Sequence, residues 1–365
     1  MTISREASPL PAFLALSLLV ASLLPAGAND TAFGGSAASP YPVHTSEIRM
    51  VSENITIKSD AKSGAWLYTC DFVFENLSED PVTIMMGMPF FRMSEGDEDF
   101  IASQPSDEQA VPAGKPMVWN FTATVDGRSV PVTEGTPTVN DLSGTLYRIA
   151  YTWPMRFDGR AARGVRKAYK PRRVPRAKRR NHSIRRVRNT YKLGYTYSLG
   201  DSFLDYILKT GGLWHDGRIG RSRLRVILDD PHYVLPKKNA PLAPLASVSG
   251  IIKPAGYKIT GGGGKIVIEW DLRNFAPKED LKVVFRLREL FIRDYAGKMK
   301  DADPRKLRNL PYAAHGYPFK DQGLRDYFAT LLYPRGNKAF KESDFSKNSR
   351  KIIATANYLE AKDNR

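Results

Sequence analysis

The chain has 365 residues, of which 42% are hydrophobic and 25% are charged, and this balance excludes a chain that is disordered over most of its length. Lys and Arg number 55 against 38 Asp and Glu, giving a formal net charge of +17 that favours anionic partners. The single cysteine, Cys70, excludes an intramolecular disulfide. We expect it to be a buried, inert thiol, with a covalent dimer or a nucleophile as the alternatives.

The first 28 residues are typical of an export signal. Arg5 precedes an apolar run at residues 13–24, and Ala26-Gly27-Ala28 has the small-x-small pattern that a signal peptidase accepts. The run is too short to cross a bilayer core of about 30 Å as a helix. We therefore expect cleavage after Ala28 and a mature protein in the periplasm or outside the cell, without access to intracellular nucleic acid.

Residues 29–293 are predicted to form a β-rich domain. Short runs rich in Val, Ile, Thr, Tyr and Phe alternate with turn residues, which favours an antiparallel sandwich or an open barrel. The glycines at 261–264 precede the strand-like run at 265–270 and not a helix, so they indicate a turn and not a phosphate-binding loop. The expected strands include residues 54–58, 66–74, 82–88, 117–125, 147–153, 192–198, 224–228, 265–270 and 282–290.

A small α-helical domain is predicted at residues 300–361, after a change from β to α pattern near 294–303. Asp303-Pro304 can begin a helix, with the aspartate as its cap. Apolar residues recur at three- and four-residue steps in 322–332, and a last helix is expected from 343 or 346 to 361.

The sequence PYAAHGYPFKD at 311–321, followed by Leu324 and Asp326-Tyr327-Phe328, resembles the YARHG domain of bacterial extracytoplasmic proteins over about residues 307–359. Ala314 stands where that family has an arginine. The family has no established biochemical activity, so the resemblance implies a module and not a reaction. Its motif residues in this chain are Tyr312, His315, Gly316, Tyr317 and Phe319.

Residues 29–290 are similar to an exported bacterial family of unknown function. The similarity depends on short motifs: ANDTA at 28–32, MVSE at 50–53, Phe-x-Asn at 74–76, DPV at 80–82, MPF at 88–90 and TGGLW at 210–214, followed by Ile219-Gly220.

Local catalytic and metal-binding patterns are absent from the sequence. His44, His182, His215 and His232 stand singly, so neither a metal nor a cofactor is expected. For His315, beside Gly316, a structural role in a turn competes with ligand binding and catalysis. No catalytic residue is assigned.

Two further groups have structural interpretations that we favour. Asp229-Asp230 before Pro231 indicates a turn more than a carboxylate pair. Tryptophans at strand or turn positions favour core packing, with sugar stacking as the alternative. These are Trp153, Trp214 and Trp270.

The segment 160–192 holds 15 Lys or Arg and no acidic residue. We expect a basic loop that binds anionic lipid headgroups, phosphorylated polymers or peptidoglycan carboxylates. A solvated insertion, a processing site and extracellular nucleic acid are the alternatives. The candidate anion-binding residues are Arg172, Arg173, Arg176, Lys178, Arg179, Arg180, Arg185, Arg186 and Arg188.

Together these patterns predict a non-enzymatic bacterial cell-envelope protein. It would attach to an anionic envelope polymer or membrane surface through the basic loop and the YARHG-like module. The alternative is a cell-wall polymer hydrolase with dispersed catalytic acids or with His215 and Asp216 at its centre. A third possibility is a structural role with an envelope protein partner.

Overall fold

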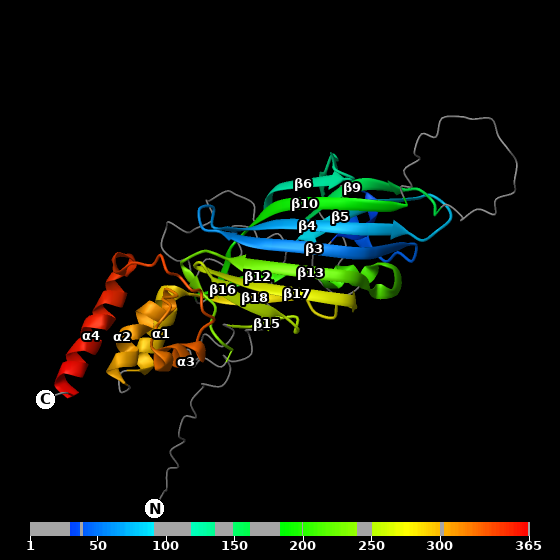
Figure 1. Cartoon of the computed structure of the whole chain (residues 1–365). Helices are drawn as coiled ribbons and strands as arrows, with labels where there is room; N and C mark the ends of the chain where they lie inside the picture. The colour runs from blue at the N-terminus through cyan, green and yellow to red at the C-terminus, as the bar shows by residue number, and fades with distance from the viewer. Residues whose placement is uncertain are drawn as a thin grey trace, which may run out of the picture.

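The computed structural model describes residues 30–36, 39–90, 118–135, 149–160, 183–198, 200–238, 250–299 and 303–363. Strands make up 48% of the described chain, and its four α-helices come after the last strand, so the predicted class of a mainly β protein with a helical C-terminal part is confirmed. Figure 1 shows an elongated molecule with the β body on one side and the helices gathered at one end.

An eight-stranded sheet is the largest layer. Its order is β16-β17-β13-β3-β4-β10-β6-β7. Neighbouring strands are antiparallel except for β3 and β13, which run parallel with Met50 opposite Ile219. A parallel pair cannot be joined by a hairpin, and these two strands are far apart in the chain. The bounds are β3 Ile48–Asp60, β4 Ala65–Asn76, β6 Val118–Val125, β7 Arg128–Ser129, β10 Ile184–Gly194, β13 Ile219–Leu228, β16 Lys258–Gly262 and β17 Lys265–Phe275.

Two smaller sheets pack against the large one. One has the order β2-β1-β5-β9-β8, and the other has the order β11-β12-β18-β14 with β15 paired to β18. The bounds are β1 Thr31–Ser36, β2 Ser39–Val43, β5 Val82–Phe90, β8 Thr133–Gly135, β9 Ile149–Phe157, β11 Thr196–Ser198, β12 Asp201–Tyr206, β14 Tyr233–Val234, β15 Ile252–Lys253 and β18 Leu281–Leu287.

Aromatic side chains join the layers. Phe121 of the large sheet stacks on Tyr151 of one small sheet at 4.5 Å between ring centroids. Trp66 of the large sheet stacks on Phe285 of the other at 5.4 Å. One apolar core therefore fills the space between the large sheet and both small ones.

The predicted core residues of the β body are confirmed. Trp153, Trp214 and Trp270 are buried, and the Trp214 indole donates to the Asp30 carbonyl at 3.1 Å. Cys70 is also fully buried, and burial raises the pKa of its thiol well above the ordinary value. A neutral thiol in an apolar core has little reactivity, in line with the interpretation of Cys70 as inert.

Three helices lie where the sequence patterns predict them: α2 Pro304–Ala314, α3 Gln322–Ala329 and α4 Lys347–Asp363. They follow α1 Arg288–Lys298, which the patterns do not predict. Asp303 caps α2 by accepting from the Arg305 amide at 2.9 Å, as predicted. No helix among the described residues has both the length and the apolar character needed to cross a bilayer.

The change from strand to helix lies earlier than the sequence suggests. Helix α1 begins at Arg288, directly after β18, whereas the pattern places the change near residues 294–303. Phe291, Ile292 and Tyr295 of α1 belong to a second apolar core that the helices share. A short apolar run cannot be assigned to strand or helix from its periodicity alone, which explains the difference.

The glycine run forms the predicted turn. Gly263 and Gly264 join β16 to β17 with φ angles of +58° and +78°, a backbone region that favours glycine. Gly261 has a separate requirement, because a Cβ there would lie 1.8 Å from the Pro334 carbonyl oxygen. The hairpin is thus also the place where the helical part approaches the β body.

Candidate functional site

The predicted basic loop is only partly within the described structure. Six of its candidate residues lie outside the described residues: Arg172, Arg173, Arg176, Lys178, Arg179 and Arg180. Arg185, Arg186 and Arg188 lie on β10, so from Ile184 onward the segment is a strand and not the expected loop. The reason is the alternation of buried Val187, Tyr191 and Leu193 with outward-facing polar residues.

Two of these three arginines are paired with carboxylates. Arg185 contacts Asp126 at 2.7 Å, and Arg188 makes a two-pronged pair with Asp71 at 2.6 and 3.2 Å. The Arg186 side chain has no carboxylate partner among the described residues and is exposed. Only one of the three therefore presents an unpaired guanidinium.

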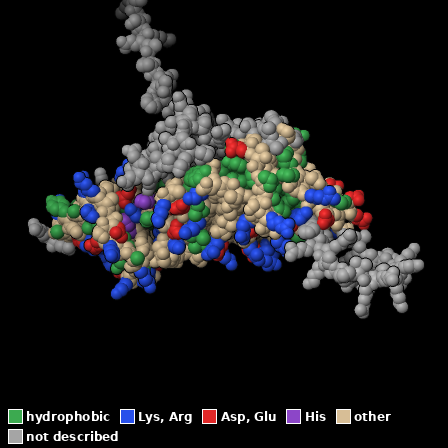
Figure 2. Space-filling view, turned by 90° about the horizontal axis from the view of Figure 1, so that it is seen from above, with side chains coloured by type: hydrophobic (Ala, Val, Ile, Leu, Met, Phe, Trp, Pro, Cys, Tyr) green, Lys and Arg blue, Asp and Glu red, His purple; other side chains and the backbone are tan. Residues whose placement is uncertain are grey.

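The outward surface of the eight-stranded sheet, here called the outer face, carries more arginines. Arg221, Arg223 and Arg225 point outward from alternate positions of β13. Arg221 pairs with Asp271 at 2.6 Å and Arg225 with Glu269 at 3.1 Å. Arg223 and Arg273 are exposed and form no ion pair with a described carboxylate, although their charges add to the hydrogen bond from Arg221 in lowering the pKa of Asp271. Figure 2 shows Lys and Arg side chains grouped along one edge of the β body.

The YARHG motif residues separate into different environments. Phe319 is buried and stacks on Phe328 at 5.4 Å, whereas Tyr317 is 43% exposed. Tyr312 is half-buried and its hydroxyl donates to Glu342 at 2.5 Å. Most of the motif therefore supports the interior of the module.

His315 lies at the C-terminal end of α2, in the turn that the sequence predicts. Its ring is 5% exposed and lies 4.7 Å from the Phe340 ring. Gly316 follows with φ +82°, and its carbonyl accepts from the Asn337 amide at 2.8 Å. This turn holds His315 against the loop that contains Asn337 and Phe340.

A pocket of about 260 Å³ lies where the helical module meets the β body. The body contributes Pro231 and Gly264. The module contributes polar side chains of Arg288, His315, Arg335, Asn337 and Asp344, and the ring of Phe340.

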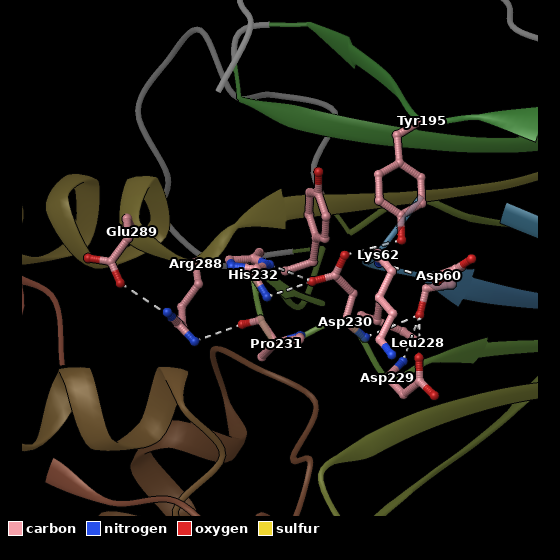
Figure 3. A network of polar contacts seen from close by, with 12 residues as sticks. Asp60, Lys62, Tyr195, Leu228, Asp229, Asp230, Pro231, His232, Arg288 and Glu289 are labelled. Carbon is pink, nitrogen blue, oxygen red and sulfur yellow. Dashed lines mark hydrogen bonds and ion pairs between the residues drawn. The ribbon is translucent and has the colours of Figure 1, made fainter. Parts of the chain in front are cut away.

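Two arginines place positive charge beside this pocket. Arg335 is 4% exposed, and its guanidinium donates to the carbonyls of Tyr233 at 2.9 Å and Leu228 at 3.2 Å. Arg288 donates to the Pro231 carbonyl at 2.7 Å and to Glu289 at 3.3 Å (Figure 3). Burial lowers the pKa of Arg335 to about 10, which still leaves it charged at neutral pH.

His315 is held neutral beside these charges. Burial, with the nearby charges of Arg288 and Arg335, lowers the pKa of His315 to about 3 against the opposing effect of Asp344. Its Nε2 is buried with no hydrogen-bond partner among the described residues.

Asp229 and Asp230 directly precede a turn at residues 231–232, in line with the turn interpretation, and they form a polar network next to the pocket. Asp230 accepts from the His232 ring at 2.9 Å and the Tyr195 hydroxyl at 3.1 Å (Figure 3). Burial opposes ionisation of Asp230, but the hydrogen bonds from His232 hold its pKa below the ordinary value. Asp229 pairs with Lys58 at 3.1 Å, so each carboxylate has its own partners.

The predicted alternative centre at His215 lies away from this pocket. The His215 ring is bonded to the Ser46 carbonyl at 2.6 Å and to the largely exposed Asp216 at 3.0 Å. Within the described ranges, no group of three or more His, Cys, Asp or Glu side chains is placed to hold a metal ion.

The fold and the pocket define a two-part protein, a β body with a helical module docked on it. Residues 286–361 match the YARHG domain model, and residues 28–145 match the domain of unknown function DUF4424. The C-terminal part is therefore a YARHG domain, and the resemblance seen in its sequence is confirmed. The match begins two residues before α1, in agreement with the structural start of the module.

Comparison with solved structures gives a match that extends over most of the chain. A Legionella pneumophila protein, provisionally named a nutrient binding protein, is 27% identical with a TM-score of 0.57, over 90% of this chain and 100% of that one. An M1 zinc metallopeptidase from Deinococcus radiodurans has a TM-score of 0.29 and 11% identity, over 69% of this chain and 45% of that one. No curated protein shows significant similarity.

Proposed function

We propose that this chain is a non-enzymatic, exported binding protein that attaches to anionic polymers or lipid headgroups of the bacterial cell envelope. The basic segment, residues 160–192, and the outer face attract the anionic partner, and the YARHG domain adds a more selective contact. The observation that carries the proposal is a set of exposed arginines on the outer face that form no ion pair with a described carboxylate: Arg186, Arg223 and Arg273.

The neighbouring ion pairs leave these three side chains available. Arg188, Arg221 and Arg225 are already paired across the sheet, so they contribute little net charge. An unpaired guanidinium can instead form two parallel hydrogen bonds with a phosphate or a carboxylate. Near an anionic bilayer each such residue contributes about 1 kcal/mol, so several acting together with the basic segment can retain the protein there.

Similarity to a protein named for binding supports a binding role over a catalytic one. The hydrolase alternative can be checked directly by incubating the mature protein with purified cell wall. Release of soluble fragments would contradict the proposal.

The main test measures binding of the mature protein to phosphatidylglycerol vesicles and to isolated cell wall. Raising salt from about 0.1 M to about 1 M shortens the Debye length from about 10 Å to about 3 Å, so binding should fall steeply. Combined replacement of the three unpaired arginines by Gln should weaken binding at low salt. Binding that is independent of salt would refute the proposal.

A matched control separates the outer face from general charge. Lys347, Lys351 and Lys362 are exposed on α4, and their replacement by Gln removes the same charge from another part of the molecule. Equal losses in both triple variants would contradict a role for the outer face. Deletion of residues 161–182 tests the basic segment separately and leaves β10 intact.

A further inference from the structure

We infer that the pocket between the YARHG domain and the β body is a binding site for a small molecule that carries a single carboxylate group. This site is independent of the outer face, and its function does not depend on attachment to the envelope.

Positively charged side chains predominate in the lining of the pocket. The pocket is lined by two guanidinium groups, Arg288 and Arg335, and by one carboxylate, Asp344. The two guanidinium groups lie close enough for each to lower the pKa of His315, and Arg288 also lowers that of Arg335. Carboxylates offset part of this positive charge, since Glu289, Asp230 and Asp344 act on Arg288, and Asp230 and Asp229 act on Arg335. The remaining attraction therefore favours an anion with one negative charge over one with two.

The lining of the pocket also contains hydrogen-bond donors. Arg288 uses Nη1 for the Pro231 carbonyl and Nε for Glu289, which leaves Nη2 without a bond to any described residue. His315 also lines the pocket, and its ring makes no hydrogen bond to any residue that the structure describes. One oxygen of a carboxylate can accept from each of these two groups.

Hydrogen bonds hold the two arginines of the pocket in fixed positions. Arg335 is fixed by two body carbonyls, and its backbone carbonyl accepts from the Gly264 amide at 3.1 Å. The backbone of Arg288 donates to the His232 carbonyl at 2.8 Å. The charged groups are therefore held in place before any ligand arrives, which lowers the entropy cost of binding. Phe340 and Pro231 provide apolar surface for the rest of the ligand.

The test is a titration of the full mature protein with sodium acetate and sodium propionate, followed by NMR of the His315 imidazole. The His315 signal is assigned by its loss in His315→Gln. We expect a saturable shift with a dissociation constant of about 1 mM, reasonable for a ligand of four or five heavy atoms. Sodium chloride at the same concentrations should give no saturable shift.

Two variants of the pocket should change the affinity for acetate in opposite directions. Arg288→Gln removes the donor and its charge, so acetate affinity should fall by about tenfold or more. Asp344→Asn removes the opposing carboxylate but keeps an oxygen that can accept from the Lys341 amide, so affinity should rise several-fold. Because Arg288→Gln can disturb folding, the gain in Asp344→Asn keeps the proposal testable. Asp326→Asn, an exposed aspartate of α3 outside the pocket, is the matched control and should leave affinity unchanged.

Three results would overturn the inference. These are identical shifts with chloride and acetate, saturable binding of inorganic phosphate but not of acetate, and equal effects of Asp344→Asn and Asp326→Asn. None of them bears on the outer face, because envelope attachment is measured separately with the three arginine replacements.

Discussion

The neutral, buried imidazole of His315 makes a sharp prediction about pH and stability. The pKa of His315 is about 3 in the folded protein, against an ordinary value of 6.5. Below pH 6.5 the unfolded chain binds a proton on this ring, whereas the folded protein does not until the pH is near 3. The unfolded state therefore binds more protons, and folding stability falls as the pH falls through this window.

The size of the effect follows from the width of the window. Each pH unit below 6.5 lowers the free energy of unfolding by about 1.4 kcal/mol. At pH 5 the His315 ring therefore destabilises the folded protein by about 2 kcal/mol. Replacement of His315 by Gln removes the titration and should remove this loss.

The assay is urea unfolding followed by tryptophan fluorescence at pH 7.5 and pH 5, in buffers without carboxylates. The quantity compared is the change in unfolding free energy between the two pH values. The wild type should lose about 2 kcal/mol more than His315→Gln, because the other titrating groups are common to both proteins. His44→Gln, which replaces an exposed histidine, should behave as the wild type. Equal losses in wild type and His315→Gln would refute the reasoning from burial and neighbouring charge.

Three further predictions follow from other buried features. Arg286 is 3% exposed and forms a buried ion pair with Asp201, so Arg286→Met removes the charge that faces this aspartate and should cost about 3–5 kcal/mol in urea unfolding. A loss under about 1 kcal/mol would contradict that. Gly316→Ala places a Cβ 2.8 Å from the Arg335 side chain at φ +82° and should cost about 1–2 kcal/mol or more. Gly297→Ala has open space and is its control, expected to be neutral or stabilising. Cys70 should react with a thiol reagent only after unfolding, and rapid reaction in the native protein would contradict its burial.

Local patterns in the sequence predict most of the elements. The alternation of apolar residues in runs such as 66–74 predicts strands because every second side chain must enter the core. Asp303 and Asp321 precede helices that they cap, and such caps can be recognised from residue type alone. The two-residue turn at Gly263 and Gly264 is predictable for the same reason, since few other residues accept its backbone angles.

The pocket could not be predicted from the sequence in the same way. Arg288 and Arg335 are separated by α1, α2 and α3, and nothing local distinguishes them from the many paired arginines on the surface. The motif marks His315 but does not indicate what faces it. The only local signal is Tyr333-Pro334-Arg335-Gly336-Asn337, a turn-rich segment beside an arginine. The parallel pairing of β3 with β13 is equally non-local.

The docking of the module explains why the pocket needs both parts of the chain. Residues 331–333 lie along residues 235–237, with the Lys237 amide donating to the Leu331 carbonyl at 2.7 Å and the Tyr333 amide to the Leu235 carbonyl at 3.0 Å. This pairing carries the chain to Arg335, which then inserts its guanidinium against the body carbonyls.

Without the body, Arg335 would lose both of those acceptors, and the pocket would lose the walls formed by Pro231 and Gly264. The glycines of the β16–β17 hairpin have a corresponding role, because a side chain at Gly261 would collide with the Pro334 carbonyl. A buried guanidinium without acceptors is costly, so the isolated module cannot keep Arg335 in this position. The carboxylate site is therefore a property of the docked pair, and any change that loosens the hairpin from the module should weaken acetate binding even when every pocket side chain is present.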